Sequence, residues 1–147
     1  MPIPQLSEHG FLPDGVHECT LEEILTRFAR FQDSDRRPAL GRELEAYVGE
    51  LRSAEVGKYL VVDGSFVSGE PAPSDIDLVL VLQDDISLAG TLPPFQYNAR
   101  SRKYVRRNYR FDLFPVPEGD GVDEMISFFR QVKHCPGEVK GMLKVVL

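Results

Sequence analysis

The sequence predicts an α+β fold in which a mixed β-sheet is flanked by helices. Short apolar runs rich in β-branched residues indicate strands, and longer segments with apolar residues at helical spacing indicate helices. Loops that contain proline and glycine separate these segments. Because 147 residues suit one domain, we expect residues 1–147 to form a single domain, with residues 1–19 as an extended N-terminal arm.

The first predicted helix begins after Thr20. Thr20 and Glu23 have the spacing of a capping box, and apolar residues then follow at helical spacing from Leu21 to Phe28. The remaining elements, in chain order, are a helix over 38–54, strands over 58–63 and 75–82, a basic helix over 96–107, a strand over 109–116, a helix over 122–129 and a final strand over 139–147.

Charge and composition exclude several classes of protein. The net charge of −6 argues against a general nucleic-acid-coating protein. The charge is nevertheless polarised, because residues 100–110 hold six basic residues and no acidic ones. No run of eighteen apolar residues occurs and the two cysteines lack metal-ligand spacing. We therefore expect a cytoplasmic protein without a membrane segment.

Two aspartates at the start of the most apolar strand are the first candidate site residues. Asp75 and Asp77 are two residues apart, which on a strand places their side chains on one face. Carboxylates held this close repel one another unless they are protonated, paired or bound to a cation. Asp112, in another predicted strand, can complete a cluster able to hold two Mg²⁺ or Mn²⁺ ions.

The dipeptide Gly64-Ser65 ends the strand that precedes these aspartates. Glycine lets the backbone approach a ligand closely, and the hydroxyl and nearby N–H groups of such a turn can hold a phosphate. A Gly-Ser dipeptide alone is most often an ordinary turn, and an Asp-x-Asp pair alone is common in loops. The order and spacing of the two motifs make a functional site the better interpretation.

The order of these features resembles the signature of the DNA polymerase β-like nucleotidyltransferase superfamily. A predicted strand is followed by Gly64-Ser65, nine intervening residues, Asp75-Ile76-Asp77-Leu78 and, on a later predicted strand, Asp112. The segments 12–20 and 137–141 are similar to the flanks of an uncharacterised group of small, single-domain bacterial nucleotidyltransferase-like proteins. With these flanks, the resemblance extends over nearly the whole chain.

This resemblance implies a nucleotidyltransferase-like fold and a two-metal transfer of a nucleoside monophosphate from a nucleoside triphosphate such as ATP. Gly64 and Ser65 would hold the phosphates, and Asp75 and Asp77 would bind the metals. Asp112 would bind one of these metals and help to activate the acceptor hydroxyl. Many relatives carry an arginine soon after the Gly-Ser, whereas this chain has Phe66-Val67-Ser68-Gly69.

The basic segment 100–110 has two interpretations. It is either a phosphate clamp, for which Arg107 and Arg110 are the nucleotide-binding candidates, or a solvated helix face that balances acidic residues elsewhere. If one helix spans the segment, Arg100, Lys103 and Arg107 share a face. Arg110 also has the position of an ion-pair partner for Asp112.

Two functions from different classes follow from this sequence. The first is a metal-dependent nucleotidyltransferase that modifies a hydroxyl of a protein, an RNA or a small molecule. By analogy with relatives of minimal size, the acceptor could be the toxin of a toxin–antitoxin pair. The second is a catalytically reduced binding module that acts as an antitoxin or regulator by contact with a partner protein.

Overall fold

The computed structural model describes residues 3–30, 35–132, 135 and 137–147. The first two residues of the predicted arm therefore lie outside the described part of the chain. The elements are, in order, β1 (Val16–Glu18), α1 (Leu21–Phe28), α2 (Arg36–Ala54), β2 (Gly57–Asp63), the 3₁₀ helix η1 (Ser65–Val67), β3 (Asp77–Leu82), α3 (Pro94–Ala99), α4 (Arg102–Tyr109), β4 (Asp112–Pro117), α5 (Asp120–Phe129) and β5 (Met142–Val146).

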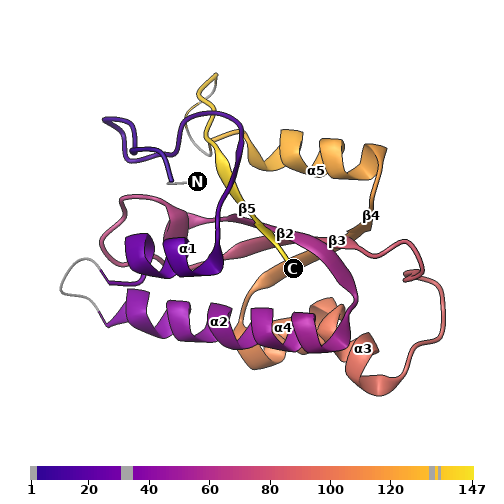
Figure 1. Cartoon of the computed structure of the whole chain (residues 1–147). Coiled ribbons are helices and arrows are strands. Elements are labelled where there is room, and N and C mark those ends of the chain that lie inside the picture. Colours follow the sequence, from indigo (N-terminus) through magenta and orange to yellow (C-terminus); the bar gives the residue numbers. More distant parts are fainter. Residues whose placement is uncertain (1–2, 31–34, 133–134, 136) are drawn as a thin grey trace.

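The strands form one mixed five-stranded sheet in the order β1-β5-β2-β3-β4 (Figure 1). The pairs β1–β5 and β3–β4 are parallel, and β2 is antiparallel to both β3 and β5. The sequence-based prediction of an α+β fold with a mixed sheet flanked by helices is therefore confirmed. Strand β4 lies at an edge, which is where a strand can accommodate Pro115 and Pro117.

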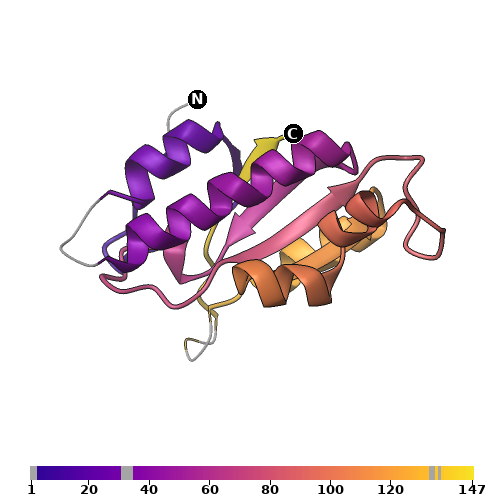
Figure 2. The same cartoon turned by 90° about the horizontal axis from the view of Figure 1, so that it is seen from below.

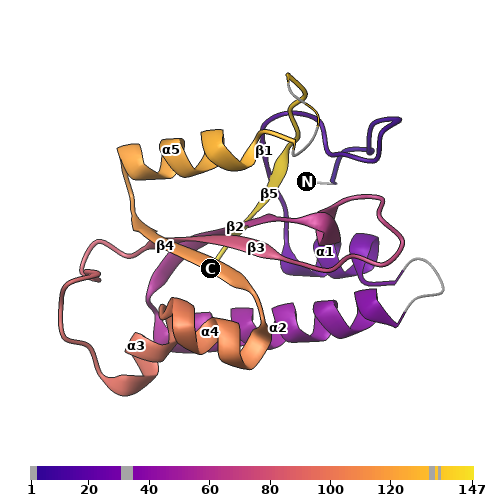
Figure 3. The same cartoon turned by 180° about the vertical axis from the view of Figure 1, so that it is seen from behind.

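Helices cover both faces of the sheet unequally. Helices α1 to α4 lie on one face, and α5 lies alone on the other (Figures 1 and 3). On the first face α2 runs alongside α1 (Figure 2). The two faces follow the alternation of the strands, because Leu78, Leu80 and Leu82 join the larger core, whereas Val79 and Val81 join a smaller core under α5.

The N-terminal region follows the local signals closely. The Thr20 hydroxyl accepts a hydrogen bond from Glu23 N, and the Glu23 carboxylate accepts one from Thr20 N, so the capping box is confirmed. The predicted arm contains strand β1, which pairs with β5, so the end of the arm is part of the sheet. Leu12 of the arm is buried in the main core, and Asp14 makes two hydrogen bonds with Arg130 at the end of α5.

The predicted basic helix over 96–107 is wrong in one respect, because two helices occupy this region. Helix α3 ends at Ala99, and Ser101 caps α4 by accepting a hydrogen bond from Tyr104 N. Tyr47 of α2 stabilises the break, since its hydroxyl donates to Ala99 O at 2.6 Å. Arg100 is consequently buried beside the break and does not share an exposed helix face with the later basic residues.

The predicted strand boundaries also need correction at the N-terminal ends. Strand β3 begins at Asp77 rather than at residue 75, and β4 begins at Asp112, because residues up to Tyr109 belong to α4. Within the described residues, no helix combines the length and the apolar character needed to cross a membrane.

Candidate functional site

Three carboxylates lie in a row across neighbouring strands. Asp63 at the end of β2 is directly opposite Asp77 of β3, and Asp77 is directly opposite Asp112 of β4. Adjacent strands are about 4.8 Å apart, and opposite residues project to the same face. Alternate residues along these strands belong to the core under α5, so the three carboxylates lie on the α5 face of the sheet.

Asp75 reaches the same region from a loop and not from the strand. Its Oδ1 accepts hydrogen bonds from Ser65 N at 2.8 Å and from Ser65 Oγ at 2.7 Å. Its backbone oxygen accepts from Phe66 N, which closes the segment between β2 and β3 into a compact loop. The expected side-by-side projection of Asp75 and Asp77 from one strand is therefore wrong, although the loop still brings the two carboxylates together.

Gly64 makes this closure possible. Its φ of +96° belongs to a region that side-chain-bearing residues rarely adopt. A Cβ here would lie only 3.0 Å from Asp75 O and from Asp77 N. The 3₁₀ turn that starts at Ser65 follows directly. In this structure the Ser65 donors orient Asp75, so phosphate binding by the Gly64-Ser65 turn stays a prediction.

Asp63 and Lys140 are site residues that the sequence-based reasoning missed. Asp63 is only 2% exposed, so its carboxylate is shielded from water. The Lys140 ammonium lies 3.1 Å from Asp63 Oδ1 and is its ion-pair partner. A hydrophobic strand that ends in Asp before Gly-Ser was the available signal for Asp63. Lys140 had none, because it comes from the distant C-terminal segment.

The cluster carries more negative charge than nearby cations balance. Burial, together with the neighbouring carboxylates Asp75, Asp63 and Asp112, raises the pKa of Asp77 to about 7. Burial also raises the pKa of Asp63, while Lys140 acts in the opposite direction. Strongly perturbed carboxyl groups in a cleft are a frequent property of functional sites.

All these carboxylates line one cleft of about 1240 Å³, which is large enough for a nucleotide-sized ligand. Gly64 and Ser65 also line it, so the cleft unites five of the seven residues predicted from the sequence. Its other walls come from the N-terminal arm, from aromatic residues of β4 and α5, and from the C-terminal segment with Lys140.

The two predicted arginines lie elsewhere. Arg107 is exposed on α4, and Arg110 follows that helix in a left-handed conformation with φ 65°. Neither is among the residues that line the cleft. The partner of Asp112 is Arg106, at 2.9 Å, and not Arg110 as expected. A nucleotide-binding role for Arg107 and Arg110 stays a prediction.

Arg37 supports the loop that carries the Gly-Ser turn. This residue of α2 is completely buried, and burial lowers its pKa to about 10. Its guanidinium donates to four backbone oxygens, those of Phe28, Phe66, Ser68 and Glu70. Arg37 thereby joins the end of α1 to the segment after Ser65. Arg37 precedes the predicted helix over 38–54, and no local sequence pattern indicated this role.

The residues have the right chemistry for a hard cation, but their present arrangement is not closed around one. Among the described residues, no three His, Cys, Asp or Glu side chains gather closely enough to hold a metal ion. Two of the carboxylates are instead bound to other side chains, since Asp112 is paired with Arg106 and Asp75 accepts hydrogen bonds from Ser65. Because the Arg106–Asp112 pair is exposed, its release costs only about 0–1 kcal/mol.

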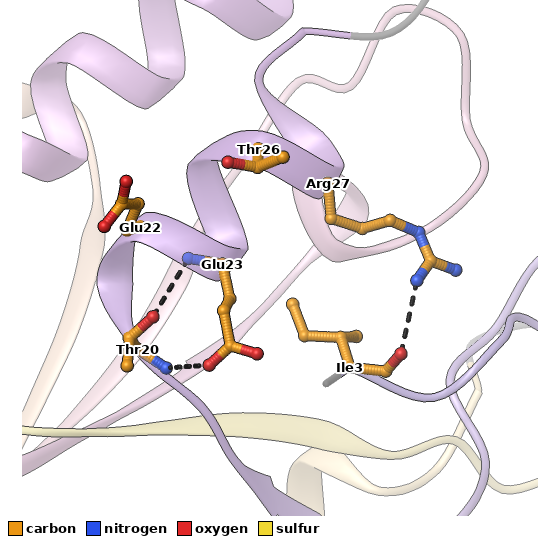
Figure 4. Close-up of a pocket in the computed structure, with 6 residues that line it drawn as sticks. All are labelled: Ile3, Thr20, Glu22, Glu23, Thr26 and Arg27. Atoms are coloured by element: carbon orange, nitrogen blue, oxygen red, sulfur yellow. Dashed lines mark hydrogen bonds between the residues drawn. The ribbon is translucent and has the colours of Figure 1, made fainter. Parts of the chain in front are cut away.

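A second, smaller hollow lies beside the start of α1 (Figure 4). Three of its polar side chains already have partners, since Thr20 and Glu23 form the capping box and Arg27 donates to Ile3 O. We therefore assign it a structural role in attaching the N-terminal arm.

Fold and cleft together define a class of protein: an α+β domain in which three neighbouring strands present a row of carboxylates beside a tight glycine turn. The chain belongs to the protein family described as a family of unknown function (DUF6932), whose model matches residues 4–146. No curated protein and no solved structure matches the chain.

Proposed function

We propose that this protein is a metal-dependent nucleotidyltransferase that moves a nucleoside monophosphate from a nucleoside triphosphate to a hydroxyl group. The observation that carries the proposal is the convergence of Asp75, Asp77 and Asp112 with the Gly64-Ser65 turn in one cleft. A structural role alone does not explain the convergence, because clustered carboxylates repel one another and destabilise the fold.

In this proposal Asp75, Asp77 and Asp112 would bind two Mg²⁺ or Mn²⁺ ions. When bound, such a metal pair stabilises the attacking and leaving oxygens of an in-line phosphoryl displacement. The acceptor oxygen forms a bond to the α-phosphorus, the bond to the bridging oxygen breaks, and pyrophosphate leaves. Asp112, whose side chain is 47% exposed, accepts the proton of the acceptor hydroxyl.

Lys140 supplies a cation in place of the arginine that many relatives carry soon after the Gly-Ser dipeptide. It lines the same cleft, and its side chain is 20% exposed. In the metal-free protein its charge offsets that of Asp63. A bound triphosphate offers three or more anionic oxygens, so we expect the ammonium to contact both Asp63 and the phosphates.

The proposed substrates, nucleoside triphosphates, are metabolites of the cytoplasm, which is where we expect the protein to act. The acceptor is a protein, an RNA or a small molecule. A protein acceptor such as a toxin would bind at the open mouth of the cleft.

A second candidate function is a contact-only antitoxin or regulator with the same fold. Two observations favour it. The Ser65 donors are occupied by Asp75, and the Asp112 carboxylate is paired with Arg106. A protein that never binds nucleotide has no need to release these contacts.

Label transfer separates the two functions. The purified protein is incubated with α-labelled nucleoside triphosphates, Mg²⁺ or Mn²⁺ and a cell lysate. We expect labelled acceptor with the native chain and none with Asp77→Ala. The matched control is Asp85→Asn, an exposed aspartate outside the cleft, which should transfer label normally.

Two outcomes would contradict the proposal. Undiminished label transfer by Asp77→Ala would mean that the chemistry takes place elsewhere. Absence of any triphosphate binding by the native protein would favour the contact-only function.

A further inference from the structure

The carboxylate cleft continues into an aromatic wall formed by Phe114, Phe128 and Phe129, which we define as the phenylalanine wall. We propose that this wall binds the base of the nucleotide, an inference that rests on the proposed function. It places the nucleoside end of the substrate beside α5 and β4. The phosphates then lie near Lys140 and near the carboxylates that would bind the metals.

The wall begins next to the proposed reacting centre. Phe114 follows Asp112 by two residues on the same strand, so both side chains are on the α5 face. Alternate residues on a strand are roughly 6.6 Å apart. A nucleotide whose α-phosphate lies at the carboxylates therefore has its base within reach of this ring.

Two of the rings are held firmly. The Phe114 and Phe129 rings contact edge to face, with centroids 5.1 Å apart. The Arg102 guanidinium lies 4.7 Å from the centroid of Phe114. Contacts with these two neighbours restrict the orientation of the Phe114 ring, as a binding platform requires.

The third ring is open to solvent. Phe128 is 70% exposed, although its ring contacts that of Phe129 at 5.3 Å. An exposed phenylalanine beside a polar cleft leaves apolar area that a planar ligand can cover. Gln131, which also lines the cleft, carries an amide that can both donate to and accept from the edge of a base.

These features favour a nucleobase over a protein side chain as the occupant. The wall is continuous with the carboxylates in a single cleft, so a ligand that fills the cleft has both an anionic end and a planar apolar end. Stacking on aromatic side chains accepts every base, because each base has a π-face. We therefore expect the wall to favour nucleotides over bare phosphates, with little selectivity among bases.

The test compares the Mg²⁺ complexes of a nucleoside triphosphate and of inorganic tripolyphosphate, which has the phosphates but no base. Binding of both is measured by calorimetry for the native chain, Phe128→Ala and Phe128→Tyr. The control is Phe95→Ala, which removes an exposed phenylalanine of α3 that does not line the cleft.

We expect Phe128→Ala to weaken nucleoside triphosphate binding about tenfold, within the range for loss of one base–aromatic stack. Tripolyphosphate binding should not change. Phe128→Tyr and Phe95→Ala should bind both ligands as the native chain does, and all variants should keep the native circular dichroism spectrum, since both rings are exposed.

Three results would overturn the inference. If the native chain binds both ligands equally, the base makes no contact, while the phosphate site still stands. If Phe128→Ala binds the nucleoside triphosphate normally, the base lies elsewhere. The phenylalanine wall would then serve to bind a protein partner instead. If neither ligand binds the native chain, the proposed function fails together with the inference.

Discussion

Replacement of Asp77 by asparagine should make the metal-free protein more stable. Asparagine has nearly the same shape as aspartate but carries no charge. Asp77 lies between Asp63 and Asp112 on neighbouring strands and close to Asp75, so its ionisation is opposed by burial and by three carboxylates. The neutral side chain removes this repulsion without creating a cavity.

The magnitude follows from the pKa of Asp77, which rises from its ordinary value of 3.8 to about 7. At ~1.36 kcal/mol for each pKa unit, full ionisation costs the folded state about 4 kcal/mol at most. Relaxation and solvent screening reduce this figure, and about 2 kcal/mol is a realistic gain for Asp77→Asn. For a domain of this size such a gain raises the melting temperature by about 4–8 °C.

The effect has a defined pH dependence. Because the folded-state pKa of Asp77 is raised, the folded protein binds more protons than the unfolded chain between pH 3.8 and about 7. The stability of the native chain should therefore fall through this window and level off above it. The advantage of Asp77→Asn should be absent near pH 4 and complete near pH 8.

Thermal and urea unfolding at pH 4.5, 6 and 8, with and without Mg²⁺, provide the assay. Mg²⁺ at tenfold its dissociation constant should stabilise the native chain by about 1.4 kcal/mol and leave Asp77→Asn unchanged. The control Asp85→Asn should match the native chain throughout. Equal or lower stability of Asp77→Asn at pH 8 without metal would refute the reasoning about the charge cluster.

Three further predictions concern the cleft and its support. Lys140→Gln should weaken the binding of nucleoside triphosphate and of tripolyphosphate to the same extent in calorimetry, because the ammonium contacts the phosphates and not the base. Weaker binding of only one of these two ligands would contradict the prediction. Arg37→Met should lower the free energy of unfolding by about 3–5 kcal/mol in urea, since four backbone oxygens lose their donors, whereas the exposed Arg107→Met should change it by less than about 0.5 kcal/mol. Gly64→Ala should cost about 1–3 kcal/mol because of its positive φ and close backbone contacts, and a stability equal to that of the native chain would show that the turn relaxes freely.

The sequence by itself determined the local structure and identified most of the carboxylates that line the cleft. The capping box at Thr20, the buried strand β2 and the leucines of β3 depend on neighbours within four residues, which is the range that periodicity reports. Asp77 and Asp112 could be predicted for the same reason, because an apolar strand segment follows each of them directly in the sequence.

Only the tertiary structure decided which distant residues complete the cleft. The register that sets Asp63 opposite Asp77 joins separate strands, and Lys140 arrives from the far end of the chain. Arg37 has the sequence context of a surface residue, yet it is buried because four backbone oxygens of other segments converge on it. Burial and strand register are properties of contacts distant in sequence, so local patterns do not encode them.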